Sequence, residues 1–172
     1  MLACGPAHAL KLERLESRYG AGRYLITLQV VLDAAPSAVG AVLKDYEAYP
    51  VLDPSIRSSE RIGVEPDGTI LLRTRIQACE GLFCRRVMRV ERIAEAPDSL
   101  LATVIPGRSE VRRGVTRTSW QARGGETLVN YHAEFEPDFW VPAVIGRRFA
   151  GHTLRESTLE LFRNVEERAR GQ

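Results

Sequence analysis

Few side chains in this sequence are suited to acid–base chemistry, and most of them lie on strand-like segments. His132 and Glu134 are two positions apart on an alternating strand, so both face one side and could exchange a proton. A solvated outer face of the sheet is the alternative, which we favour. Glu91 and Tyr131 are the best candidates for polar groups that face inward. No Ser/His/Asp or Cys/His arrangement can be placed from the spacing, so the sequence predicts no catalytic residue.

Cys79 and Cys84 form a second pair of side chains that could react with each other. They flank residues 80–83, a loop of hairpin length between two strand-like runs. Residues facing each other at a hairpin end have Cα atoms about 4.5–5.5 Å apart, which suits a disulfide. Two reduced cysteines beside a turn are the alternative. No second Cys or His pair has ligand spacing, so we expect no metal site.

The first nine residues read MLACGPAHA, and Ala7-His8-Ala9 matches the small-x-small site cut by a signal peptidase. We therefore expect residues 1–9 to be a signal-peptide remnant and residues 10–172 to be a single domain. Export to the periplasm, or secretion, by a bacterium would provide the oxidising compartment that a disulfide needs. The alternative is a cytoplasmic protein with chance alanines at its start. A lipoprotein acylated at Cys4 fits less well, because the hydrophobic stretch is missing.

Basic residues are nearly all arginine, and several are expected to lie close together: Arg108, Arg112, Arg113, Arg117, Arg147 and Arg148. Guanidinium groups match phosphate geometry, so one interpretation is a transient contact with an anionic headgroup or membrane surface. An ordinary solvated face is the alternative that we favour. Phe139 and Trp140 could touch a lipid surface, gate a cavity or plug the core.

The composition excludes several classes of protein. A length of 172 residues with 44% hydrophobic content fits one globular domain. The net charge of +2 is too small to indicate nucleic acid. There is no glycine-rich phosphate loop, and the sequence predicts no cofactor.

Hydrophobic periodicity and turn signals predict the elements that position these residues. Residues 10–18 could be a short strand or an extended arm. Residues 24–32 read as a strand, followed by two short helices that end at Pro50. Six antiparallel strands then follow in hairpins, at 56–65, 69–77, 84–95, 100–105, 110–122 and 126–136. Residues 142–169 complete the chain as one long amphipathic helix.

The last strand and the long helix show the clearest faces. Alternation places Thr127, Val129, Tyr131, Ala133 and Phe135 toward the helix. On the helix, one apolar to small stripe contains Ala150, Leu154, Thr158, Leu161 and Val165. A helix of this length needs a broad partner surface, so we expect a curved sheet folded around it.

The order of elements and certain loops resemble the START-like superfamily of helix-grip proteins, which includes polyketide cyclases and coenzyme-Q-binding proteins. The resemblance covers about residues 24–169. It rests on Ala35-Pro36, residues 43–50 and 54–59, Trp120, Pro137 and Trp140-Val141-Pro142. It implies an α+β helix-grip fold, in which a seven-stranded curved antiparallel sheet holds a long C-terminal helix, with two short helices after the first strand. It also implies a cavity that takes a lipid, quinone, sterol or polyketide-like molecule.

The sequence therefore favours a non-enzymatic binder or carrier of a hydrophobic molecule. The residues expected to line its cavity are Ile76, Val129, Tyr131, Phe135, Trp140, Ile145, Ala150 and Leu154. Gly114, Gly146 and Gly151 are small and could either admit a ligand or allow tight packing. The alternatives are a cyclase or dehydratase of the polyketide type, and a module that docks on other proteins.

Overall fold

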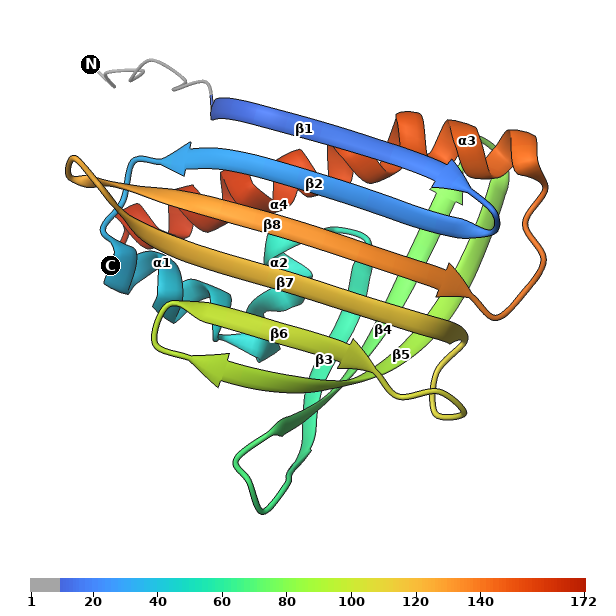
Figure 1. The fold of residues 1–172 in the computed structure, drawn as a ribbon, viewed down its shortest axis with the longest axis horizontal. Coiled ribbons are helices and arrows are strands. Elements are labelled where there is room, and N and C mark those ends of the chain that lie inside the picture. The colour runs from blue at the N-terminus through green and yellow to red at the C-terminus, as the bar shows by residue number, and fades with distance from the viewer. Residues whose placement is uncertain (1–9) are drawn as a thin grey trace, which may run out of the picture.

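The computed structural model describes residues 10–172, so the expected signal-peptide remnant, Cys4 and His8 lie outside the described residues. Strands and helices follow one another along the chain as Figure 1 shows. In order they are β1 (Lys11–Gly20), β2 (Arg23–Leu32), α1 (Pro36–Leu43), η1 (Tyr46–Ala48), α2 (Tyr49–Leu52), β3 (Ile56–Val64), β4 (Ile70–Glu80), β5 (Phe83–Ala96), β6 (Ser99–Val104), β7 (Val111–Arg123), β8 (Glu126–Pro137), α3 (Ala143–Gly151) and α4 (Thr153–Arg170).

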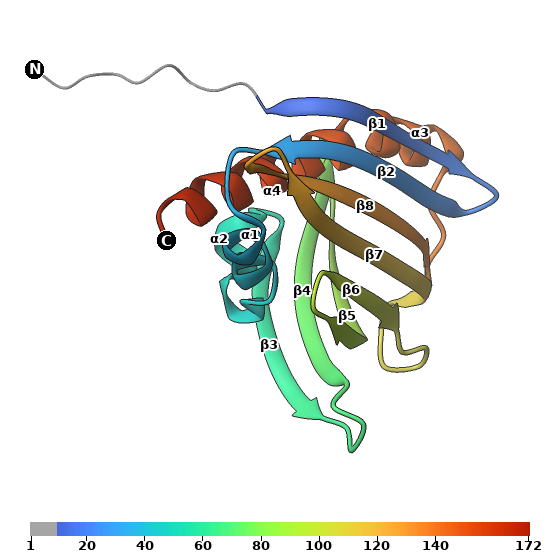
Figure 2. The same ribbon diagram turned by 60° about the vertical axis from the view of Figure 1, so that its left-hand side comes forward.

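The strands form one antiparallel sheet in the order β1-β2-β8-β7-β6-β5-β4-β3. The sheet curves, and α1, α2 and α4 lie on its concave side (Figures 1 and 2). The α+β helix-grip architecture expected from the sequence is therefore confirmed. Hairpins join β3 through β8 as predicted, because each pair is separated by a turn rich in Gly, Pro, Asp or Ser.

The sheet has eight strands among residues 10–172 rather than the expected seven. The additional strand is β1, for which the sequence left a short strand or an arm open. It pairs with β2 along nearly its whole length. Ala21 and Gly22 connect the two strands with positive φ angles of 50° and 76°, as a two-residue hairpin turn requires.

The C-terminal helix is not continuous, which corrects the prediction of one helix over residues 142–169. It divides at His152, whose φ of −126° and ψ of −76° are not helical and separate α3 from α4. The redirected α3 packs against β1. There, Ser17 Oγ donates a hydrogen bond of 2.6 Å to the Ala150 carbonyl, and a Cβ added at Gly146 would lie 2.6 Å from the Tyr19 ring. Gly146 is therefore small because β1 approaches closely there.

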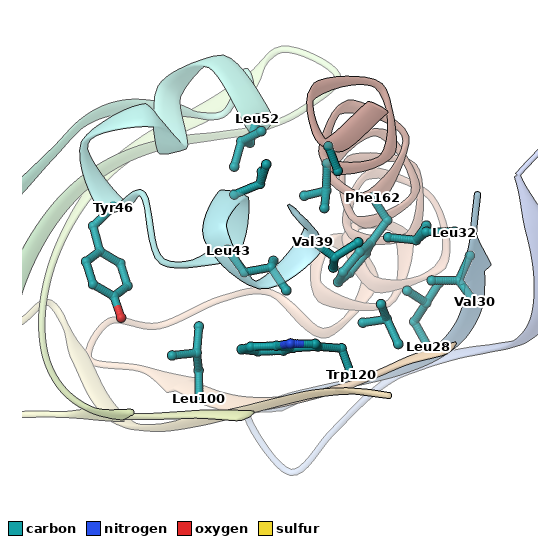
Figure 3. Packing of buried hydrophobic residues seen from close by; sticks show 14 of the residues in the cluster. Leu28, Val30, Leu32, Val39, Leu43, Tyr46, Leu52, Leu100, Trp120 and Phe162 are labelled. Atoms are coloured by element: carbon teal, nitrogen blue, oxygen red, sulfur yellow. The ribbon is translucent and has the colours of Figure 1, made fainter. Parts of the chain in front are cut away.

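The well-packed core lies where α1 meets the second half of α4. Figure 3 shows Trp120 between Leu28 and Leu100, and Val39 and Leu43 of α1 lie over one face of its ring. Trp120 is only 4% exposed. A Cβ at Gly40 would lie 2.9 Å from its indole nitrogen, so α1 rests directly on the ring.

Phe162, Val165 and Ala169 of α4 complete this cluster, which we call the α1 end of the grip. Phe162 and Val165 are fully buried, and Phe162 points toward Leu32 and Val39 in Figure 3. Dense packing of this kind leaves little room for a ligand. Space for a ligand must therefore lie beside this cluster rather than within it.

Candidate ligand-binding cavity

A cavity of about 280 Å³ lies between the concave face of the sheet and helices α3 and α4, and it reaches the α1 end, where Leu43, Leu100 and Phe162 form part of its wall. This volume is close to the lower end of small-molecule sites, which span about 300–1,000 Å³. Its wall is mostly apolar and includes Ile26, Leu72, Val87, Ala133, Phe149 and Leu161. On β5 and β8 the lining residues alternate, because every second side chain of a strand faces the helices.

The structure brings five of the eight predicted lining residues to this cavity, and their role in binding stays a prediction. They are Ile76, Tyr131, Phe135, Ile145 and Leu154. The predicted inward faces of β4 and β8 account for the first three. Leu154 and Ile145 come from the two helices on either side of the break at His152.

The other three predicted residues do not line the cavity. Val129 has the expected orientation but lies further along β8, where it is fully buried in the core at the α1 end. Ala150 is 1% exposed in the part of α3 that packs against β1, where its carbonyl accepts the hydrogen bond from Ser17. Trp140 lies in the loop before α3 and is 81% exposed.

The cavity also contains charged residues, of which the sequence indicated only Glu91. Arg89 and Glu91 are two positions apart on β5 and both line the wall. The guanidinium Nε of Arg89 lies 2.9 Å from Glu91 Oε2, and the Glu91 side chain is 5% exposed. Arg89 could have been found from the alternation of Val87, Arg89, Glu91 and Ile93, which places all four on one face.

The pair is an ion-pair contact without the alignment of a hydrogen bond. Nε of Arg89 is buried and has no hydrogen-bond partner among residues 10–172. A buried donor without a partner costs about 1–3 kcal/mol. The Arg89 side chain as a whole is 23% exposed and lines the cavity, so the pair marks a polar point in an apolar space.

Two tyrosines lie close to the pair. Burial raises the pKa of Tyr131 to about 12, against a smaller opposing effect of Arg89. Burial also raises the pKa of Tyr49, whose hydroxyl donates a hydrogen bond of 2.9 Å to the Leu43 carbonyl. Both phenols are therefore neutral at physiological pH and can act as hydrogen-bond donors.

His132 and Glu134 do not form a proton-transfer pair. Nδ1 of His132 lies 3.2 Å from Thr27 Oγ1 on the neighbouring strand. Glu134 accepts a hydrogen bond of 3.4 Å from Arg23. Their partners both belong to β2, so these residues stabilise the pairing of β2 with β8.

The mouth of the cavity lies at the turn between β4 and β5. Of the described lining residues, the two that are exposed are Phe83 and Arg85. The predicted disulfide between Cys79 and Cys84 is present beside them, with Cα atoms 4.1 Å apart. The turn is shorter than predicted, because Glu80 and Phe83 pair and leave only Gly81 and Leu82 between the strands.

Contacts connect this turn to the helices. The Arg85 guanidinium lies 3.9 Å from the centre of the Phe139 ring. Glu80 accepts a hydrogen bond of 2.6 Å from Thr153 at the start of α4. It also lies 3.5 Å from Arg148 of α3. These contacts therefore connect the turn with the loop before α3 and with both helices.

The arginines expected to form one face are partly engaged by carboxylates. Arg112 contacts Glu136 at 3.0 Å and Asp138 at 3.2 Å.

No helix within residues 10–172 combines the length and apolar character needed to cross a membrane.

Comparison with known proteins supports the architecture. The sequence profile of a family described as polyketide cyclase / dehydrase and lipid transport matches residues 24–167. The match begins at the first residues of β2, so β1 lies outside it. A sequence search among curated proteins finds no match.

Solved structures share the fold at low sequence identity. The Zhui aromatase/cyclase from Streptomyces sp. R1128 has a TM-score of 0.71 at 12% identity, covering 86% of this chain and 94% of its own. A STAR-related lipid transfer protein from Xanthomonas axonopodis has a TM-score of 0.68 at 17% identity, covering 95% and 99%. A START superfamily protein from Mycobacterium smegmatis has a TM-score of 0.67 at 19% identity, covering 86% and 97%.

Proposed function

Because the chain belongs to the polyketide cyclase / dehydrase and lipid transport family, we propose that it binds and carries a hydrophobic small molecule or lipid. The observation that carries this proposal is the mainly apolar cavity of about 280 Å³ between the sheet and the last two helices. Burial of apolar ligand surface would supply most of the affinity, at about 25 cal/mol per Å². A lipid, quinone, sterol or polyketide-like molecule would meet this requirement.

The polar point at Arg89 and Glu91 would orient the ligand. A carbonyl, carboxylate or hydroxyl oxygen of the ligand would accept a hydrogen bond from the Arg89 guanidinium, which lines the cavity. Neutral Tyr131 lines the same cavity and could donate a second hydrogen bond. The ligand would therefore be largely apolar, with an oxygen group near one point of its length.

Leu154→Arg tests the proposal. Leu154 is half-buried on α4 and lines the cavity, so a guanidinium there would meet an apolar wall and disfavour an apolar ligand. We expect wild-type protein purified from its own organism to carry a ligand detectable by native mass spectrometry and solvent extraction. We expect Leu154→Arg to lose it.

Leu101→Arg is the matched control, because Leu101 of β6 is 40% exposed and does not line the cavity. This variant should keep the ligand. Circular dichroism would show that both variants are folded. An unchanged ligand content in folded Leu154→Arg would overturn the proposal.

An enzyme of the polyketide cyclase or dehydratase type is the second candidate. The observation that favours it is that Glu91 and Tyr131, together with Arg89, line one cavity. In an enzyme, Glu91→Gln and Tyr131→Phe would lower kcat for an aromatic or polyketide-like substrate while binding persists. In a carrier the same variants would change affinity, and the bound molecule would be recovered unaltered.

Export to the periplasm or beyond the cell belongs to the same proposal. It is supported by the disulfide between Cys79 and Cys84, since such bonds persist in oxidising compartments. Cell fractionation followed by alkylation of free thiols would test it. Recovery of reduced protein from the cytoplasm would contradict it.

A further inference from the structure

Exposed apolar side chains gather on the rim of the mouth, which we define as residues 80–86 and 138–148. Leu82 is fully exposed at the tip of the β4–β5 turn, with a relative exposure of 106%. Trp140, in the loop before α3, is 81% exposed and Val144 of α3 is 62% exposed. Figure 1 places the start of β5 beside α3, and Glu80 next to this turn lies 3.5 Å from Arg148 of α3. Single exposed apolar residues are common, but a group around an opening indicates an interaction site.

Positive charge accompanies these side chains. The rim holds Arg85, Arg86, Arg147 and Arg148, all of them exposed, against the carboxylates of Glu80 and Asp138. The excess on the rim, four arginines over two acidic residues, equals the net charge of +2 of the whole chain. The opening of the cavity therefore carries a net positive charge.

We propose that this rim docks on the surface of an anionic phospholipid bilayer. Tryptophan favours the interface between headgroups and acyl chains, where Trp140 would lie. Leu82 and Val144 would insert shallowly beside it, and the arginines would contact lipid phosphates. A bilayer fits this rim because it offers an apolar layer and a negative layer at once.

Docking in this orientation would bring the mouth into contact with the apolar layer. Phe83 and Arg85, the exposed lining residues, lie on the same turn as Leu82. A water-insoluble molecule could then pass between bilayer and cavity without crossing bulk water. This inference goes beyond the proposed function, since a carrier could also receive its ligand from another protein. Empty vesicles suffice to test it, so its failure and that of ligand binding are distinguishable.

The test is co-sedimentation of the full chain with vesicles of phosphatidylcholine, with or without about 30% phosphatidylglycerol. We expect binding that requires the anionic lipid and weakens as salt is added. The fluorescence of Trp140 should shift to shorter wavelength and be quenched by brominated lipid. Trp120 is 4% exposed and would not respond, so Trp140→Phe should remove the change.

Two rim variants separate the apolar and charged contributions. Leu82→Asp should weaken vesicle binding by removing the inserted side chain. The double variant Arg86→Glu/Arg147→Glu should weaken it roughly tenfold or more, because each basic residue contributes at an anionic surface. Both variants should retain the co-purifying ligand, since none of the three residues lines the cavity.

Matched controls lie away from the rim. Val64 at the end of β3 is 60% exposed, and Arg163 is an exposed residue of α4. Val64→Asp and Arg163→Glu should bind vesicles like the wild type. The proposal is overturned if wild type does not bind anionic vesicles at low salt, if it binds neutral vesicles equally well, or if the rim variants bind as the controls do. Capture of an acidic protein without vesicle binding would assign the rim to a protein partner instead.

Discussion

The two ends of the helix grip are built from the same strands, yet one is solid and the other hollow. At the α1 end, Trp120 and Val129 of β7 and β8 are covered by α1 and the second half of α4. Toward α3, Thr118 and Tyr131 continue the same strands but line the cavity. The difference arises above the sheet, where α3 turns aside onto β1 instead of filling the space.

This contrast shows how a fold can be stable and still keep an internal space. Dense packing at one end provides stability, while the other end keeps a volume that only a ligand would fill. Substitutions at the solid end should therefore change the free energy of unfolding, whereas those at the hollow end should change ligand affinity more than stability.

The largest expected effect comes from a matched pair of substitutions, one at each end. Trp120→Ala removes a side chain that is 4% exposed and should lower the free energy of unfolding by about 3–5 kcal/mol. Ile145→Ala removes a half-buried residue that already borders a cavity, so it should cost only about 1 kcal/mol, as ordinary substitutions outside the packed core do. Urea unfolding measures both. Equal losses of stability would remove the contrast between the two ends.

The pH dependence of stability offers a second test, centred on the hollow end. Tyr131 has a pKa of about 12 in the folded protein because of burial, against about 10 when unfolded. The unfolded state therefore loses its proton first, and stability should fall as pH rises from about 10 to about 12. The difference corresponds to at most about 2.7 kcal/mol.

Tyr131→Phe should reduce this alkaline slope. Urea unfolding between pH 8 and pH 11 would check it, by comparing the fall of the unfolding free energy with pH in the variant and in the wild type. Tyr24, whose pKa burial also raises to about 12, would retain its share of the slope. An identical slope in Tyr131→Phe would contradict the assignment.

The disulfide should have only a small effect on global stability. Its cysteines are separated by only 5 positions, so the loop that it closes is short and its contribution is about 2 kcal/mol or less. The double variant Cys79→Ser/Cys84→Ser should mainly increase amide hydrogen exchange at the β4–β5 turn. A loss of stability comparable to that of Trp120→Ala would show that the cross-link supports the whole fold.

Local signals in the sequence predicted much of the sheet. The strands β3 to β8 were expected within a few residues of their ends, because alternation and turn residues are local properties. The inward faces of β4 and β8 followed from the same alternation. Tyr131, Phe135 and Ile76 were assigned to the cavity wall for this reason.

The errors arose where distant segments determine the structure. No proline marks the helix break at His152. The path of α3 depends on β1, which lies far earlier in the chain. The hydrogen bond between Ser17 and Ala150, for example, joins residues that are 133 positions apart. The position of Ala150 therefore could not be predicted from the helical stripe. The position of Trp140, in the loop before α3, depends on the same path. Val129 had the correct face, but alternation does not show where along a strand a cavity ends.

The pairing of β2 with β8 also has a consequence for the order in which the protein folds. Thr27 and His132 contact each other across 105 positions, whereas the hairpins from β3 to β8 join neighbours. Long-range pairing is slow because a large loop must close first, which places such sheets in the range of milliseconds to seconds. We expect pulse-labelled hydrogen exchange to protect β3–β8 before β1 and β2. The cavity would then exist only after this last step, so a nascent chain could not hold a ligand until its first strands had joined its last.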